Sequence, residues 1–214
     1  ICAKALNNLG VILYSNRDYA GAEKRFREAI SVFDGYVKAR CNLGNAVLMP
    51  HEDGTLSMYY VSVSLGGWAT SALNHAVSTD GGLTFGNPAR MVTSPMFNLS
   101  TLVKATPARF SDGSIAVPVY HELAGKFGEL LRVSPKGQLL DKIRITYGRH
   151  SLQPAIFVDN ANRASALMRY CGKTKPNRVV AAHSDDGGNN WSEVGRTALP
   201  NPNAAISGLK LQNG

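Results

Sequence analysis

The chain has 214 residues, of which 44% are hydrophobic, and it carries a formal net charge of +8 at pH 7. This length and apolar content are enough for one sizeable core or two small ones. The longest apolar runs are well short of the roughly 20 residues that a membrane-spanning helix needs. The excess of Lys and Arg is spread along the chain, which favours a solvated basic surface over a nucleic-acid interface. A mild positive field would also suit an anionic sugar.

The two ends of the chain and its cysteines do not identify the cellular compartment of the protein. The chain opens on Ile1 without the basic and apolar segments of a secretory leader, and it closes on Gly214 in a predicted turn. We therefore expect both ends to be cut rather than natural, and the localisation stays open. Three cysteines without metal-ligand spacing are predicted to be free thiols, so neither a metal nor a cofactor is expected; they are Cys2, Cys41 and Cys171.

Residues 3–33 have the apolar spacing of two amphipathic helices separated by a polar turn. Asn8-Leu9-Gly10 returns as Asn42-Leu43-Gly44, a shift of 34 residues, which is the period of tetratricopeptide repeats. We predict a helical hairpin of this kind, with the start of a third helix, over residues 1–44. It could offer a groove for a protein partner or serve only as a packing unit. The residues that match the repeat are Leu9, Gly10, Tyr14, Ala22, Phe26 and Ala29.

After Leu48 the hydrophobic period changes to two, which is typical of strands. Thr55–Val63 and Ser114–Tyr120 are predicted strands, and each follows an Asp-Gly turn. We expect residues 45–214 to be a separate, mainly β domain.

Two turns of the form Ser-x-Asp-x-Gly-x-x-aromatic occur at Ser78–Phe85 and Ser184–Trp191, and they are 106 residues apart. That distance is two units of about 53 residues, a length typical of propeller blades. A degenerate copy lies between them, where Ser134, Lys136 and Gln138 occupy the Ser, Asp and Gly places. The Asp can accept hydrogen bonds within the turn and Gly permits positive φ, so these residues are predicted to be structural: Ser78, Asp80, Gly82, Phe85, Ser184, Asp186, Gly188 and Trp191.

The segment 45–214 combines the two turns above with Arg169, residues 199–203 and Tyr120-His121-Glu122. In these residues it resembles the BNR-repeat (Asp-box) sialidase family. The resemblance implies a partial six-bladed β-propeller of about three blades. It also implies retaining hydrolysis of terminal sialic acid or a related acidic sugar by an exo-sialidase-like glycoside hydrolase. Members of that family are often exported or envelope-associated.

The resemblance further implies three arginines that clamp the sugar carboxylate, an acid/base Asp and a nucleophilic Tyr paired with a Glu. Arg169 matches the second arginine. Val61 stands where the acid/base Asp is expected, and Gln153 stands where the Glu is expected; a Gln cannot act as a base. The first arginine would fall near Gly44 or Asn45, and the Tyr and third arginine would lie beyond residue 214.

Other polar residues are expected near the same face. Tyr120, Lys104 and Asn203 are predicted to contact the sugar, as are Arg169 and Gln153. Glu122 beside His121 could form a general acid/base pair or an ordinary strand-end pair. Three functions remain open: an incomplete sialidase-like hydrolase, a non-catalytic carbohydrate- or protein-binding propeller, and a scaffold that binds a protein through its helices.

Overall fold

The computed structural model describes residues 3–32, 46–62, 71–94, 98–208 and 210. The contacts between residues divide the chain into two units, Ile1–Ala46 and Val47–Gly214. In the described part of the chain, no helix is long and apolar enough to cross a membrane.

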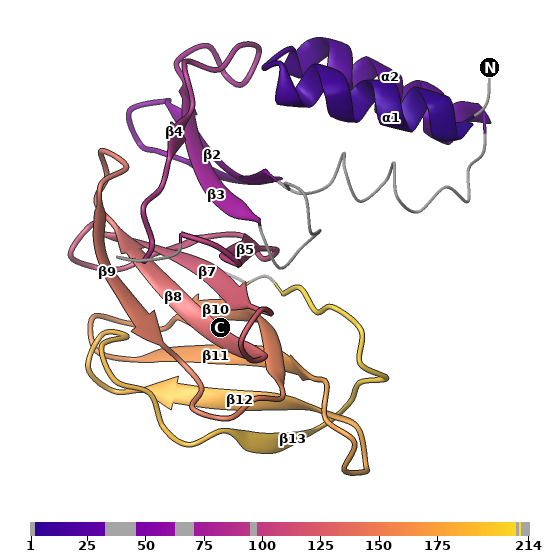
Figure 1. The fold of residues 1–214 in the computed structure, drawn as a ribbon. Helices are drawn as coiled ribbons and strands as arrows, with labels where there is room; N and C mark the ends of the chain where they lie inside the picture. The colour runs from indigo at the N-terminus through magenta and orange to yellow at the C-terminus, as the bar shows by residue number, and fades with distance from the viewer. Residues whose placement is uncertain (1–2, 33–45, 63–70, 95–97, 209, 211–214) are drawn as a thin grey trace. The chain divides into compact units, whose positions relative to one another are not determined.

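The first unit is a pair of helices, α1 (Ala3–Ser15) and α2 (Tyr19–Val32) (Figure 1). Asp18 caps the start of α2, because its Oδ1 accepts a hydrogen bond from the Gly21 N–H at 2.9 Å. Gly10 lies against Phe26, and a Cβ on Gly10 would be 2.5 Å from that ring. The predicted helical hairpin is therefore present. The second copy of the repeat, at residues 42–44, falls outside the described residues, so the tetratricopeptide assignment stays a prediction.

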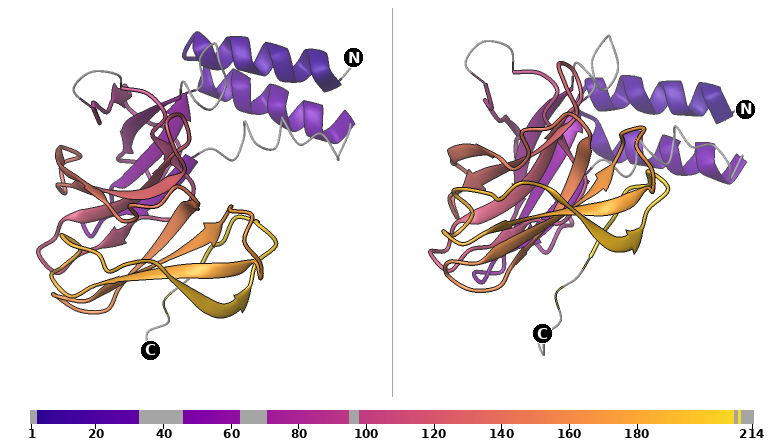
Figure 2. Two further views of the ribbon diagram at one scale, coloured as in Figure 1. Left: turned by 60° about the horizontal axis from the view of Figure 1, so that its bottom comes forward. Right: turned by 90° about the horizontal axis from the view of Figure 1, so that it is seen from below.

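The second unit contains three antiparallel sheets in the described residues (Figures 1 and 2). The first sheet has the order β1-β2-β3-β4, the middle sheet β5-β7-β8-β9 with β6 beside β7, and the last sheet β10-β11-β12-β13. Each sheet thus follows chain order, as the blades of a propeller do. Their bounds are β1 Ala46–Pro50, β2 Leu56–Ser62, β3 Ala72–Ser78, β4 Ala89–Arg90, β5 Leu102–Val103, β6 Ala108–Arg109, β7 Ile115–His121, β8 Phe127–Val133, β9 Leu139–Arg144, β10 Ser151–Val158, β11 Ala164–Tyr170, β12 Arg178–Ser184 and β13 Gly195–Pro200.

The two central strands of the middle sheet, β7 and β8, are buried on both faces. Ile115, Val117 and Val119 of β7 join a core cluster with side chains of the first sheet, and Ala116 joins a second cluster with side chains of the last sheet. Alternate residues of a strand point to opposite faces, which explains why β7 is apolar from Ile115 to Val119. The strands predicted over Thr55–Val63 and Ser114–Tyr120 are confirmed as β2 and β7, while Val63 itself lies outside the described residues.

The Asp-box turns occupy the same place in their sheets, between the third and fourth strands. In both complete turns the serine Oγ accepts a hydrogen bond from the N–H four residues later, at 2.8 Å from Gly82 and 2.8 Å from Gly188. The degenerate copy keeps this bond, from Gln138 N–H to Ser134 Oγ at 3.1 Å. The predicted worn copy between β8 and β9 is therefore confirmed, although Lys136 cannot supply the carboxylate.

The carboxylates of the two complete turns bind their own loops. Asp80 accepts hydrogen bonds from Ser78 Oγ at 2.7 Å and from the Thr84 N–H at 2.9 Å, and these contacts lower its pKa, with the Thr84 hydroxyl as the largest cause. Asp186 accepts from the Asn190 N–H at 2.8 Å, and bonds from Asn190 lower its pKa to about 2. Both Asp residues are thus committed to turn structure.

The Asp-box turn at Ser184–Trp191 also joins two sheets. The Gly187 carbonyl accepts a hydrogen bond from Arg132 of β8, and the Arg132 guanidinium lies 4.4 Å from the centre of the Phe110 ring. Gly188 has φ +88°, and a Cβ there would be 2.7 Å from the same ring. Glycine at this position therefore permits both the turn and the close approach of the middle and last sheets.

We expect Gly188→Ala to destabilise the second unit more than Gly113→Ala. Both glycines have positive φ, +88° and +82°, but a Cβ at Gly113 would meet nothing within 4 Å. Backbone strain should cost about 1–2 kcal/mol in each variant, and crowding against Phe110 should add about 1–3 kcal/mol to the first. Urea unfolding measures both. Equal losses would contradict the proposed contact between the sheets.

A buried histidine lies where the degenerate turn meets the first sheet. His75 stacks on Tyr59 with ring centres 4.8 Å apart, and its Nε2 lies 2.9 Å from Ser57 Oγ. A Cβ on Gly137 would come within 2.3 Å of the imidazole. Burial lowers the pKa of His75, and the charge of His51, which also contacts Ser57 Oγ at 2.8 Å, lowers it further.

The second unit should therefore lose stability in mild acid. Because the folded-state pKa of His75 lies below its ordinary value of 6.5, the unfolded chain binds more protons as the pH falls below 6.5. The free energy of unfolding should be lower at pH 5.5 than at pH 7.5. The drop should shrink in His75→Gln, which keeps a polar side chain without the titration. An unchanged pH dependence in this variant would rule out the assignment to His75.

Candidate functional site

The second strand of each sheet presents one residue at the same position. Val61, Tyr120 and Arg169 are each the sixth of seven residues, in β2, β7 and β11 respectively. In the middle and last sheets these residues pair with inner-strand residues, Tyr120 with Leu102 and Arg169 with Leu152. The positions that the spacing of the turns predicts for these residues within their blades therefore agree with the strand register.

Arg169 is only partly exposed. Its Nε is buried and has no hydrogen-bond partner among the described residues. A buried donor of a charged group without a partner is costly, which marks this guanidinium as one that a ligand could satisfy. Arg169 also acts electrostatically on the nearby Cys171 thiol, whose pKa is raised chiefly by burial.

Gln153 adjoins this arginine through an irregularity in β10. The register between β10 and β11 shifts between Leu152 and Ala155, and Gln153 has φ 57°, a conformation that non-glycine residues rarely adopt. Its Nε2 donates to Tyr120 Oη at 3.3 Å, while its Oε1 is buried without a partner among the described residues. The bulge thus brings side chains of the middle and last sheets together.

His121 and Glu122 are held by different contacts. His121 Nε2 accepts a hydrogen bond from the Ala124 N–H at 3.1 Å, and the ring stacks on Phe127. Burial lowers the pKa of His121, and the nearby charges of Lys142 and Arg144 lower it further. The backbone N–H of Glu122 donates to Ser100 Oγ at 3.0 Å. The lowered pKa of His121 favours the neutral imidazole at pH 7. A catalytic role for His121 or Glu122 stays a prediction.

The remaining predicted residues lie in loops. Lys104 is exposed directly after β5. Asn203 is exposed with φ 67°. Its neighbour Asn201 is buried and shapes the turn, since its Oδ1 accepts from the Ala204 N–H at 2.9 Å and its Nδ2 donates to the Ala204 carbonyl at 3.0 Å. The contact of Lys104 and Asn203 with a sugar stays a prediction.

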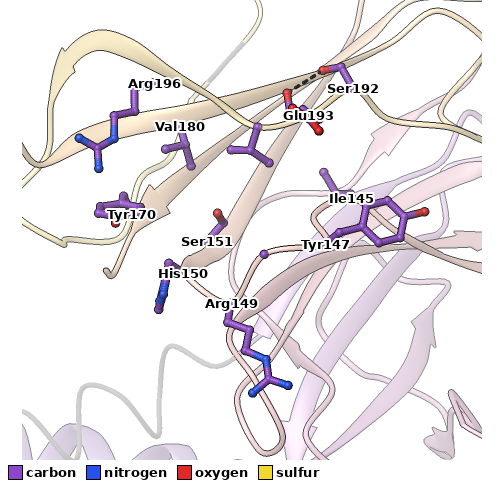
Figure 3. Close-up of a pocket in the computed structure, with 12 residues that line it drawn as sticks. Ile145, Tyr147, Arg149, His150, Ser151, Tyr170, Val180, Ser192, Glu193 and Arg196 are labelled. Atoms are coloured by element: carbon purple, nitrogen blue, oxygen red, sulfur yellow. Dashed lines mark hydrogen bonds between the residues drawn. The ribbon is translucent and has the colours of Figure 1, made fainter. Parts of the chain in front are cut away.

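Sequence reasoning missed a cavity of about 550 Å³ between the β9–β10 connection and the last sheet (Figure 3). Its walls come from segments that are far apart in the sequence, so the residue pattern of no single segment points to it. The lining residues are Ile145, Tyr147, Gly148, Arg149, His150, Ser151, Tyr170, Val180, Ser192, Glu193, Val194 and Arg196. In the part of the chain that the structure describes, no cluster of His, Cys, Asp and Glu could hold a metal ion.

Comparisons with known proteins agree with this architecture. Residues 14–214 match the family model described as BNR repeat-like domain. No curated protein matches the sequence. A protein of unknown function from Dyadobacter fermentans is 14% identical with a TM-score of 0.63, over 78% of this chain and 54% of that one.

Two enzymes also share the fold. A Hadza microbial sialidase is 14% identical with a TM-score of 0.58, over 75% of this chain and 35% of its own. A GH43 β-1,3-galactosidase is 16% identical with a TM-score of 0.53, over 71% of this chain and 31% of its own. At such identities the likeness establishes the fold, a sialidase-like β-propeller. The chain spans between about a third and about half of the length of these proteins.

The contact between Tyr120 and Gln153 should be measurable by a double-mutant cycle. We expect Tyr120→Phe to cost about 1 kcal/mol of unfolding free energy, because Gln153 Nε2 then loses its acceptor. In a Gln153→Gly background the same change should cost less, which gives a coupling of about 0.5–1 kcal/mol. Additive effects in urea unfolding would mean that the two side chains do not interact.

Proposed function

The chain belongs to the BNR repeat-like family, and we propose that its propeller binds terminal sialic acid or a related acidic sugar as part of an exo-sialidase-like glycoside hydrolase. The observation that carries this proposal is the partly buried Arg169, whose Nε has no partner among the described residues. A guanidinium presents a planar fork of donors that matches a carboxylate in two parallel hydrogen bonds.

Gln153 and Tyr120 support a binding role at the same place. Gln153 Oε1 is a buried acceptor without a partner among the described residues, and it can receive a hydrogen bond from a sugar hydroxyl. Tyr120 Oη, 3.3 Å from Gln153 Nε2, fixes the amide orientation. In this proposal Arg169 binds the carboxylate, while Gln153 and Tyr120 contact the ring substituents. Lys104 and Asn203 would lie at the rim.

Bond cleavage in a retaining sialidase needs an acid/base group and a nucleophile. Val61 and Gln153 stand where the family resemblance places the acid/base Asp and the activating Glu, and neither side chain can transfer a proton in that role. His121 and Glu122 are the alternative proton carriers. The neutral imidazole of His121 could accept a proton only by giving up its hydrogen bond from the Ala124 N–H.

Val61 and Gln153 also favour a second candidate function, a carbohydrate-binding propeller without catalysis. This function uses the same arginine and the same class of sugar. Hydrolysis of a fluorogenic α-sialoside separates the two candidates. Turnover that disappears in Arg169→Ala supports the hydrolase, whereas binding with no turnover supports the binding module.

Binding itself is tested with N-acetylneuraminic acid and its methyl ester, which has a similar shape but no charge. We expect the acid to bind more tightly than the ester. Arg169→Ala should weaken binding of the acid by about 10- to 100-fold, as expected for charge-assisted hydrogen bonds, with little effect on the ester. Isothermal titration calorimetry measures each affinity.

A matched control is Arg163→Ala. Arg163 directly precedes β11, the strand that carries Arg169. Its side chain is 70% exposed and pairs with Asp185 on the surface. This variant removes the same charge from the chain and should leave the affinity unchanged. Equal binding of acid and ester, or equal effects of the two arginine variants, would contradict the role of Arg169.

A further inference from the structure

The cavity of about 550 Å³ beside the last sheet is separate from the position of Arg169. Arg169 and Tyr170 are consecutive residues of β11, so their side chains point to opposite faces of the sheet. Tyr170 lines the cavity and Arg169 does not. The cavity volume is within the range of roughly 300–1,000 Å³ that is typical of small-molecule sites.

The cavity combines an apolar floor with aromatic walls. Ile145 and Val180 are 1% and 3% exposed and form the floor. Tyr147 and Tyr170 lie on opposite sides of the opening (Figure 3). Tyr147 is 82% exposed, and the Arg144 guanidinium lies 5.9 Å from the centre of its ring, so most of the ring faces solvent. An exposed ring at the mouth of a pocket offers a flat apolar surface to a ligand.

Tyr170 is held in a fixed position. The Arg196 guanidinium lies 4.8 Å from the centre of its ring, and it donates hydrogen bonds to the carbonyls of Thr174 at 3.1 Å and Pro176 at 3.2 Å. A hydrogen bond with Thr174 lowers the pKa of Tyr170, and Arg196 lowers it further. This wall is therefore ordered before any ligand arrives, which reduces the entropic cost of binding.

The polar rim completes the chemistry. Ser151 offers a hydroxyl and His150 offers ring nitrogens, while Ser192 Oγ already accepts a hydrogen bond from the His183 N–H and donates one to the Glu193 carbonyl. The guanidiniums of Arg149 and Arg196 outnumber the single carboxylate of Glu193. A sugar ring has an apolar face of C–H groups and an edge of hydroxyls, which suits the aromatic wall and the polar rim respectively. The excess of positive charge favours a sugar that carries a carboxylate.

We propose that this cavity is a second saccharide-binding site, which takes a carboxylate-bearing sugar unit between Tyr147 and Tyr170. The proposal rests on the proposed function for its ligand class, a saccharide, but it does not depend on Arg169. A second site would let the propeller hold two units of one acidic glycan, or two glycan chains.

The test titrates the 214-residue chain with glucuronate and with glucose, observed by saturation-transfer NMR. We expect glucuronate to bind more tightly than glucose. Tyr147→Ala should weaken binding of both sugars by about three- to tenfold through loss of the stacking surface. Arg149→Gln should weaken glucuronate selectively. Both residues are exposed, so these variants should keep the fold, which circular dichroism checks.

Two control variants remove exposed groups elsewhere. Leu83→Ala truncates a side chain that is 86% exposed in the first Asp-box turn, and Arg163→Gln removes a surface charge; neither should change sugar binding. Because glucuronate also carries the carboxylate that Arg169 is proposed to bind, the titration is repeated in an Arg169→Ala background. The glucuronate binding that remains there should still weaken about three- to tenfold when Tyr147→Ala is added. No glucuronate binding in the Arg169→Ala background, an affinity there that Tyr147→Ala leaves unchanged, or no binding of either sugar to the unsubstituted chain would each overturn the second site.

Discussion

The second unit depends on one constraint, the burial of the two central strands of the middle sheet, β7 and β8, on both faces. Each face needs a partner, so β7 and β8 contribute apolar side chains in both directions and the neighbouring sheets supply matching ones. Tight packing of this kind opposes a shift of strand register, because a one-residue shift would exchange the side chains of the two faces. The Gly187 carbonyl and the Gly188 backbone, held against Arg132 and Phe110, fix the approach at one end.

The candidate site follows from that rigid stack. The sixth residue of each second strand occupies the same position in its sheet, and the β10 bulge holds Gln153 at φ 57° against Tyr120. Among the described residues, Arg169 Nε and Gln153 Oε1 are buried without a hydrogen-bond partner, an arrangement that costs stability. Groups of this kind are common at binding sites, where a ligand supplies the missing contacts.

Much of the framework could be predicted from the sequence because it depends on local patterns. The Asp boxes, their worn copy at Ser134–Gln138 and the alternation in β2 and β7 are features of short segments. The bulge at Gln153, the contact of His121 with the Ala124 N–H and the turn formed by Asn201 depend on tertiary packing, which no short pattern encodes. The cavity was missed for the same reason, since its lining comes from four separate stretches of chain.

The central claim is that the blade framework holds Arg169 ready for a sugar carboxylate. The most direct measurement is a crystal structure of the 214-residue chain soaked with N-acetylneuraminic acid. The expected result is a sugar whose carboxylate oxygens lie within hydrogen-bond distance of the Arg169 guanidinium, with Gln153 and Tyr120 beside the ring. A sugar whose carboxylate binds only at another cation, with Arg169 left without contact, would contradict the claim.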